Sequence, residues 1–243
     1  MIFRECSIAG KLYKGEPDVP EEKSSEDEKV EVAEIKPEDT SVDGPSTSST
    51  NDTVPPVERT PPDPATVSKV KLSASVLQRF RNETLSADMA HSADTSNRDR
   101  TFSEGLRGFF TVLGLCHTVL AVVDSDTNAI EYKAQSPDEA ALVQAAADVG
   151  FIFRGREREI LRLQTPFSSD IEEYELLNLL DFNSVRKRMS VIVRRIGEGN
   201  DGKVMLLTKG ADNVIFERLR KDESEEMKTT TEQHLDEFAS DGE

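Results

Sequence analysis

Residues Tyr174–Thr208 read YELLNLLDFNSVRKRMSVIVRRIGEGNDGKVMLLT, and they give the clearest indication of the fold in this chain. Short runs of branched and aromatic residues, separated by polar or glycine-containing segments, are typical of consecutive β-strands. The loop Gly197–Gly202, rich in Gly, Asn and Asp, predicts a hairpin turn between the last two runs. With two runs that precede this segment, the predicted strands are Phe151–Arg154, Ile160–Leu163, Tyr174–Phe182, Met189–Ile196 and Lys203–Thr208.

Helices are predicted before and after these strands. Apolar residues recur at helical spacing over Gly105–Leu120. Ser136 is a predicted N-cap that is followed by proline, and Glu139 stands where it can complete a capping box. The remaining predicted elements are a strand at Ala129–Ala134 and helices at Asn213–Leu219 and Met227–Phe238. We therefore predict an α+β fold in which helices flank an antiparallel β-sheet.

Composition excludes several classes of protein. The chain has 243 residues, with 47 acidic and 30 basic side chains and a formal net charge of −17. This charge argues against binding to nucleic acid or docking on an anionic membrane surface, because both present negative phosphates. The two cysteines, Cys6 and Cys116, are too few for a disulfide scaffold and argue against a cysteine-based zinc site. The longest apolar stretch, Phe109–Val123, is shorter than the roughly 18–20 residues that span a bilayer, so we expect a soluble polypeptide with no transmembrane segment.

Acidic residues and prolines are concentrated in Glu16–Pro64. This segment holds 15 acidic and four basic residues and nine of the 11 prolines. Because it cannot bury enough apolar surface to offset the entropy of ordering, we predict that it is disordered. The weak helical pattern in Val67–Arg100 predicts little fixed structure. The predicted parts are a strand in residues 1–15, a mostly disordered acidic linker at 16–100, a folded domain at 101–239 and a truncated end at 240–243.

Three short segments concentrate chemically useful side chains: YKAQSPDEAAL (132–142), DFNSVRKRMSV (181–191) and LLTKGAD (206–212). Each segment also has a purely structural explanation. Glu139 can serve only the capping box, and Phe182 can belong to the core at the end of a strand. The basic run Arg186–Arg188 can form a solvated turn.

Taken together, the three segments favour a nucleotide site. Phe182 at the end of a strand can stack on a base, Glu139 can accept a hydrogen bond from an exocyclic amine, and Ser184 provides a hydroxyl. Lys209 is a compact cation on a flexible stem. Gly210 beside it would let a ligand approach the backbone closely.

Three basic residues follow Phe182 by four to six positions: Arg186, Lys187 and Arg188. They are close enough to reach the phosphates of a nucleotide whose base stacks on Phe182. Since the chain has no Walker A pattern, this would be a triphosphate site without a P-loop. Gly197–Gly202 matches GxGxxG, but its acidic residues and the strand that follows argue against dinucleotide binding. The histidines lack metal-ligand spacing, so we predict no metal site and interpret His117 as a packed residue.

Longer stretches around these motifs resemble a known family. AQSPDEAALVQAAADVGFIF, LLDFNSVRKRMSVIVR and LLTKGADNVIFERL resemble the nucleotide-binding (N) domain of type IV P-type ATPases, the phospholipid flippases. FFTVLGLCHTV resembles the helix in that class that ends in Cys-His-Thr-Val. The first residues, MIFRECSIAGKLYKGE, resemble the strand that follows the family's phosphorylation loop.

The resemblance implies a role for each matching residue. Phe182 corresponds to the adenine-stacking aromatic residue, and Glu139 and Ser184 correspond to positions on the base side of ATP. Lys187 corresponds to a lysine that reaches the nucleotide, and Lys209 to the lysine that lines the adenine pocket. The weaker candidates are Arg186 and Arg188, of which one would face the nucleotide and one would be structural. No catalytic residue is implied.

The flippase loop Asp-Lys-Thr-Gly-Thr, whose aspartate accepts the γ-phosphate, does not occur in this sequence. We therefore expect a fragment that binds ATP without hydrolysing it, with Mg²⁺ held together with the parent's phosphorylation (P) domain. The implied partners are the parent's P and actuator domains, its membrane helices and an accessory subunit, with no nucleic acid. The implied location is the cytosolic face of a membrane.

Two alternatives remain open at this point. The acidic segment and the missing aspartate favour a non-catalytic interaction module derived from such a domain. The chain could also be the N domain of another P-type ATPase class, one that transports ions.

Overall fold

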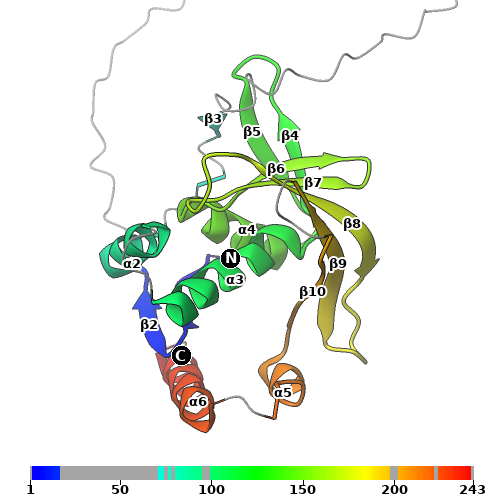
Figure 1. Ribbon diagram of the computed structural model, residues 1–243. Helices are drawn as coiled ribbons and strands as arrows, with labels where there is room; N and C mark the ends of the chain where they lie inside the picture. The colour runs from blue at the N-terminus through cyan, green and yellow to red at the C-terminus, as the bar shows by residue number, and fades with distance from the viewer. Residues whose placement is uncertain are drawn as a thin grey trace, which may run out of the picture. The chain divides into compact units, whose positions relative to one another are not determined.

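A five-stranded antiparallel sheet is the largest sheet of the computed structural model within the described residues (Figure 1). The structure describes residues 2–16, 71–73, 76–77, 80–94, 99–197, 202–221 and 224–241. The sheet has the order β10-β9-β8-β7-β6, so each strand pairs with the next one along the chain. Its strands are β6 (Ile152–Glu157), β7 (Ile160–Gln164), β8 (Glu172–Leu180), β9 (Arg188–Ile196) and β10 (Val204–Gly210). The predicted strands and the antiparallel layout are confirmed.

Alternation along the strands determines which face of the sheet is buried. In β9, Met189, Val191 and Val193 are buried on one face, as expected when successive side chains point to opposite sides of a strand. Two helices cover this face (Figure 1), α3 (Arg100–Leu115) and α4 (Pro137–Asp148).

Helix α4 begins where the sequence predicts. The Ser136 hydroxyl accepts a hydrogen bond from the backbone N–H of Glu139, and Pro137 is the first helical residue. The Glu139 carboxylate does not complete the capping box, because its hydrogen bonds go to side chains and backbone outside the helix.

A smaller sheet combines two strands that follow α3 with one that precedes it in the chain. It has the order β3-β5-β4, with β4 (Leu120–Val123) antiparallel and β3 (Lys71–Leu72) parallel to β5 (Ala129–Lys133). Beyond β10 the chain forms the short helix α5 (Asp212–Phe216) and then α6 (Glu225–Asp241). Their bounds lie within a few residues of those predicted for the last two helices.

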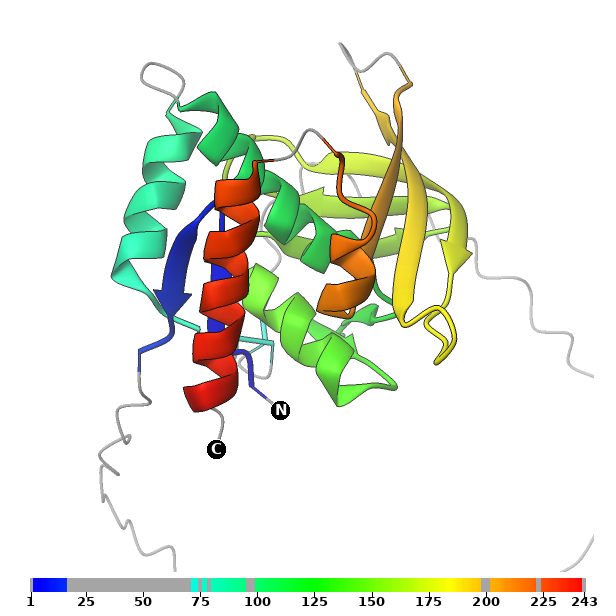
Figure 2. The same cartoon turned by 90° about the horizontal axis from the view of Figure 1, so that it is seen from below.

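The amino-terminal residues form a hairpin where the sequence analysis expects one strand. The hairpin consists of β1 (Glu5–Ile8) and β2 (Lys11–Lys14), which are joined by a turn whose residues Ala9 and Gly10 have φ angles of 49° and 78°. Two positive φ angles are typical of a tight hairpin turn. Figure 2 shows α6 beside this hairpin, where His234 Nδ1 and the Ser7 hydroxyl lie 2.8 Å apart.

Part of the predicted linker 16–100 is ordered. It contains α2 (Glu83–Ala93), which begins at an N-cap, Asn82, whose side chain accepts a hydrogen bond from the Leu85 N–H. Phe80, Leu85 and Met89 are buried in the main core. The expectation of little structure in Val67–Arg100 is therefore wrong for this part, because α2 packs against α3 and its Asp88 accepts hydrogen bonds from Lys11 and Tyr13 of β2. Apart from Glu16, the predicted disordered segment Glu16–Pro64 lies outside the described residues.

No helix within the described ranges has the length and apolar character needed to cross a bilayer.

Candidate functional site

A cavity of about 890 Å³ lies where the ends of α3, β8 and β10 meet the start of α4. Glu139, Phe182 and Lys209, one residue from each of the three sequence segments, line this cavity. The other lining residues are Phe109, Leu113, Thr118, Gln135, Ser136, Asp138, Leu142, Asp181, Met189 and Gly210. Three motifs that are far apart in the sequence therefore converge on one hollow, which has apolar walls and a few polar groups. This combination is common in small-molecule sites.

An ion pair joins two of the motifs at the wall of the cavity. Lys209 Nζ lies 3.2 Å from Glu139 Oε1, and the two side chains are 19% and 16% exposed. Glu139 Oε2 accepts hydrogen bonds from the Thr118 hydroxyl at 2.6 Å and from the Thr118 backbone N–H at 3.2 Å. Burial raises the pKa of Glu139, but the Thr118 hydrogen bonds and the Lys209 charge outweigh it, so the net pKa lies below the usual value. The carboxylate is therefore held ionised.

Phe182 is 62% exposed, although it is an aromatic residue next to a strand. The chain leaves the sheet after Leu180, the last residue of β8, so the ring does not enter the core. The interpretation of Phe182 as a core residue is wrong. The exposed ring borders the cavity and provides a flat apolar surface on which a base can stack.

Comparison with known proteins identifies the family to which the chain belongs. Residues 105–243 match the sequence model of the cytoplasmic N domain of P-type ATPases. The chain belongs to this family.

The chain is 41% identical over 169 residues to a phospholipid-transporting ATPase of Schizosaccharomyces pombe. This match covers 68% of the chain and 13% of the yeast protein. It is 47% identical over 134 residues to the ATPase dnf2 of the same yeast, covering 55% of this chain and 9% of that protein. It is also 44% identical over 141 residues to phospholipid-transporting ATPase 10 of Arabidopsis thaliana, covering 56% and 11%. The chain thus spans about a tenth of the length of these curated relatives.

The basic loop of this N domain lies outside the cavity lining. The Arg186 guanidinium donates hydrogen bonds to the backbone oxygens of Leu180 and Asp181 and to the Ser190 hydroxyl. Arg186 therefore fastens the loop to the ends of β8 and β9. Arg188 donates to the Arg186 carbonyl at 3.1 Å. Desolvation and the positive charges of Arg218 and Arg186 lower the pKa of Arg188.

Lys187 and Ser184 are exposed residues of the same loop, and neither lines the cavity. Lys187 has a φ angle of 50°, its N–H donates to the Asn183 carbonyl, and its own carbonyl accepts from the Ala211 N–H. The structure therefore gives the Lys187 backbone a role in joining the loop to the end of β10. The roles predicted for the Lys187 and Ser184 side chains stay predictions.

Gly210 lies at the end of the pairing between β9 and β10, where the LLTKGAD segment meets the basic loop of this N domain. A Cβ atom at Gly210 would lie 2.5 Å from Arg188 Cβ and 2.6 Å from the Lys187 carbonyl oxygen. Glycine is thus required at position 210 because Arg188 and the Lys187 carbonyl leave no room for a side chain. The sequence suggested a different reason, the close approach of a ligand to the backbone. Gly210 also lines the cavity, so the two explanations are compatible.

The turn that carries Thr118 is held on two sides. Cys116 Sγ lies 3.7 Å from the carbonyl oxygens of Met189 and Leu207, in hydrogen-bonding range for sulfur. His117 is buried, and its ring packs edge-on against Phe153 with 4.7 Å between centroids. The interpretation of His117 as a packed residue is confirmed.

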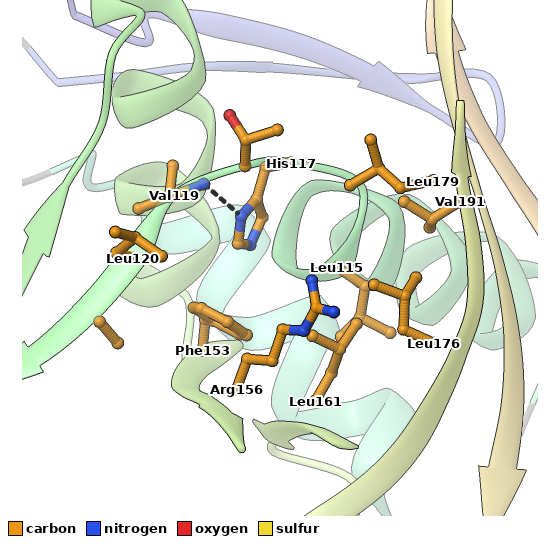
Figure 3. A pocket seen from close by; sticks show the side chains of 12 residues that line it. Leu115, His117, Val119, Leu120, Phe153, Arg156, Leu161, Leu176, Leu179 and Val191 are labelled. Carbon is orange, nitrogen blue, oxygen red and sulfur yellow. Dashed lines mark hydrogen bonds between the residues drawn. The ribbon is translucent and has the colours of Figure 1, made fainter. Parts of the chain in front are cut away.

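A smaller cavity of about 170 Å³ shares Thr118 with the main one. Figure 3 shows its mostly apolar lining, with His117 and Phe153 on one side and Leu161 and Val191 on the other. His117 Nδ1 accepts a hydrogen bond from the Val119 N–H, which is drawn as a dashed line, and Nε2 lies 2.9 Å from the Gly114 carbonyl. A neutral ring with its proton on Nε2 satisfies both contacts.

Most of the cavity walls could not be predicted from the sequence. Phe109, Leu113 and Leu142 belong to helical apolar stripes, so their pattern does not distinguish a cavity wall from the core. Thr118 had a detectable signal, since it is a polar residue shortly after the end of the apolar helix α3 at Leu115. Its contact with Glu139, 21 residues later, could not be read from spacing.

Proposed function

We propose that this N domain binds ATP in the 890 Å³ cavity as the nucleotide-binding part of a phospholipid-translocating P-type ATPase. The observation that carries the proposal is the convergence of Phe182, Glu139 and Lys209 on one cavity. The volume lies within the roughly 300–1,000 Å³ typical of small-molecule sites. The names of the similar yeast and plant proteins support the choice of phospholipid as the transported substrate.

The base is the part of ATP that this cavity suits best. A purine can stack on the exposed Phe182 ring, which is worth about 1–3 kcal/mol for a base on an aromatic side chain. Its other side would contact apolar wall residues such as Leu113 and Met189. Glu139 is ionised and fixed, so it can accept a hydrogen bond from the exocyclic amine of adenine. Lys209 supplies positive charge beside the ligand.

The phosphates would extend from the cavity toward the basic loop and an acceptor outside these 243 residues. We propose that Arg186, Lys187 and Arg188 contribute positive potential along this path, with Lys187 as the most exposed of the three. The sequence has no Asp-Lys-Thr-Gly-Thr loop, so the phosphorylated aspartate would belong to the parent's P domain. The actuator domain, the membrane helices and an accessory subunit would be the further partners, with this domain on the cytosolic face.

Mg²⁺ accompanies ATP in the family, but the described part of the chain has no group of three His, Cys, Asp or Glu side chains that could hold a metal ion. Mg²⁺ would be held together with the parent's P domain. The function proposed for this chain is to bind ATP and orient it.

A binding assay paired with a hydrolysis assay tests the proposal. We expect the purified chain to bind ATP with a dissociation constant on the order of 0.1–1 mM, equivalent to about −4 to −5.5 kcal/mol. We expect it to release no phosphate above a buffer control. Phosphate release that persists through purification and follows the protein would contradict the assignment of the acceptor to another domain.

A further inference from the structure

We propose that Thr118 is a positioning residue of the nucleotide site, which limits the Glu139 carboxylate to a single free acceptor position aimed at the base. This inference rests on the proposed ATP binding and adds a residue that determines specificity. Thr118 acts through Glu139, so its effect should appear in the choice between nucleotides as well as in affinity.

The hydrogen bonds of Glu139 leave little freedom to its carboxylate. Each carboxylate oxygen can accept about two hydrogen bonds. Oε2 already accepts two, one from the Thr118 hydroxyl at 2.6 Å and one from the Thr118 N–H at 3.2 Å. Oε1 accepts one, from Lys209 Nζ at 3.2 Å. One acceptor position therefore remains, on Oε1 beside Lys209, and a ligand must present a donor there.

The backbone around Thr118 is rigid enough for this task. On one side, Cys116 contacts the carbonyls of Met189 in β9 and Leu207 in β10. On the other side, the His117 ring links Gly114 to Val119 (Figure 3). Tertiary contacts fix both residues that precede Thr118. The Thr118 hydroxyl and N–H are therefore already positioned to donate to the same carboxylate oxygen.

Other charged groups share the cavity with Glu139, and they do not replace Thr118. Asp138 and Asp181 line the cavity and are acidic, so they cannot donate to a carboxylate when ionised. His117 lies close by, but burial lowers its pKa to about 4, so it is neutral near pH 7. Lys209 contacts the opposite oxygen. Among the described groups around Glu139, Thr118 thus provides the contacts to Oε2.

The free acceptor position discriminates between purines that differ at the 6-position. Adenine carries an amine, a donor, at this position, whereas hypoxanthine carries a carbonyl, an acceptor, and has its donor on the neighbouring N1 instead. A fixed carboxylate oxygen favours the amine and repels the carbonyl. A carboxylate that is free to rotate can turn away from the carbonyl, so loss of Thr118 should weaken ATP binding and also reduce the preference for ATP over ITP.

The experiment compares two substitutions of Thr118 in the 243-residue chain. Thr118→Val removes the hydroxyl and keeps the shape and the backbone N–H, and Thr118→Ser keeps the hydroxyl. Thr127→Val is the matched control, because it removes a hydroxyl-to-carboxylate hydrogen bond of 2.8 Å, to Asp124, in the turn between β4 and β5. ATP and ITP are titrated into each variant by calorimetry, and the titration of the Glu139 carboxyl carbon is followed by NMR.

We expect Thr118→Val to weaken ATP binding roughly three- to tenfold, to bring the ATP and ITP affinities closer together, and to raise the pKa of Glu139. Thr118→Ser and Thr127→Val should bind ATP within about twofold of the wild type.

If wild type binds ATP and Thr118→Val binds it equally well with the same preference for ATP over ITP, the inference is wrong while ATP binding stands. If Thr118→Ser is as impaired as Thr118→Val, the hydroxyl is not the cause and the inference is also wrong. If wild type binds no ATP, the proposed function itself fails, and this inference with it.

Discussion

Lys209 and Glu139 stand 70 residues apart in the sequence, and their charged groups lie 3.2 Å apart in the structure. Lys209 precedes the last residue of β10, and Glu139 lies in the first turn of α4. Both side chains are less than one-fifth exposed, so water screens their attraction less than it screens a surface pair. The pair joins two motifs at the wall of the cavity and gives it its polar character.

Replacing Phe182 tests the stacking surface. Because the ring is 62% exposed, Phe182→Ala should leave the midpoint of urea unfolding almost unchanged. It should weaken ATP binding by about 1–3 kcal/mol, the usual contribution of stacking a base on an aromatic ring. Isothermal titration calorimetry measures the second effect.

The matched control for Phe182 is Val185→Ala, since Val185 is 93% exposed in the same loop and does not line the cavity. We expect this variant to bind ATP like the wild type. Equal affinity of Phe182→Ala and wild type would remove Phe182 from the site.

Gly210 tests the contact between the KGAD motif and the basic loop. Gly210→Ala places a Cβ 2.5 Å from Arg188 Cβ, so the strand or the loop must move. We expect a loss of about 1–3 kcal/mol in the free energy of unfolding, as for other overpacked sites, together with weaker ATP binding. Chemical denaturation measures the stability term.

Gly108→Ala is the same substitution at another glycine, and we expect it to raise the free energy of unfolding where Gly210→Ala lowers it. Gly108 lies within α3, and an added Cβ there would meet nothing within 4 Å. The variant should be more stable by about 0.5–1 kcal/mol, because alanine loses less backbone entropy in a helix. A stability change of the same sign at both glycines would contradict the packing described here.

His117 gives the domain a pH-dependent stability. Burial lowers the pKa of His117 to about 4, below the usual 6.5, so the unfolded chain binds this proton more readily than the folded chain. The contribution of the neutral ring is complete above pH 6.5 and is lost as the pH falls toward 4, by up to about 3 kcal/mol.

The measurement compares the unfolding free energies of wild type and His117→Gln between pH 7 and pH 4.5. The difference between the two proteins isolates His117 from the carboxylates that titrate in the same range. We expect wild type to lose stability more steeply than the variant as the pH falls. Parallel curves would show that His117 is not buried in its neutral form.

The sheet was largely predictable from the sequence, and the reason is local. β8 and β9 carry their buried apolar residues at alternate positions over most of their length, and a glycine-rich loop precedes β10. The start of α4 was equally predictable, since Ser136 and Pro137 together form a strong N-terminal signal. Both depend on residues close together in sequence.

The parts that could not be predicted depend on contacts between distant residues. Helix α2 has a weak pattern of its own, and Leu85 and Met89 are core residues in a helix that packs against α3. Phe182, Glu139 and Lys209, which line the cavity, could be selected from the sequence because their side chains suit the binding of a nucleotide. Arg186 was expected near a ligand, yet its guanidinium folds back onto backbone carbonyls five and six residues earlier.

A titration of ATP followed by NMR of the backbone amides tests the nucleotide site most directly. We predict saturable shifts centred on Glu139, Phe182 and Lys209, with a midpoint on the order of 0.1–1 mM, and little change in α2 or the β1–β2 hairpin. Absence of any shift near these three residues at several millimolar ATP, in a chain whose spectrum shows it to be folded, would contradict the account.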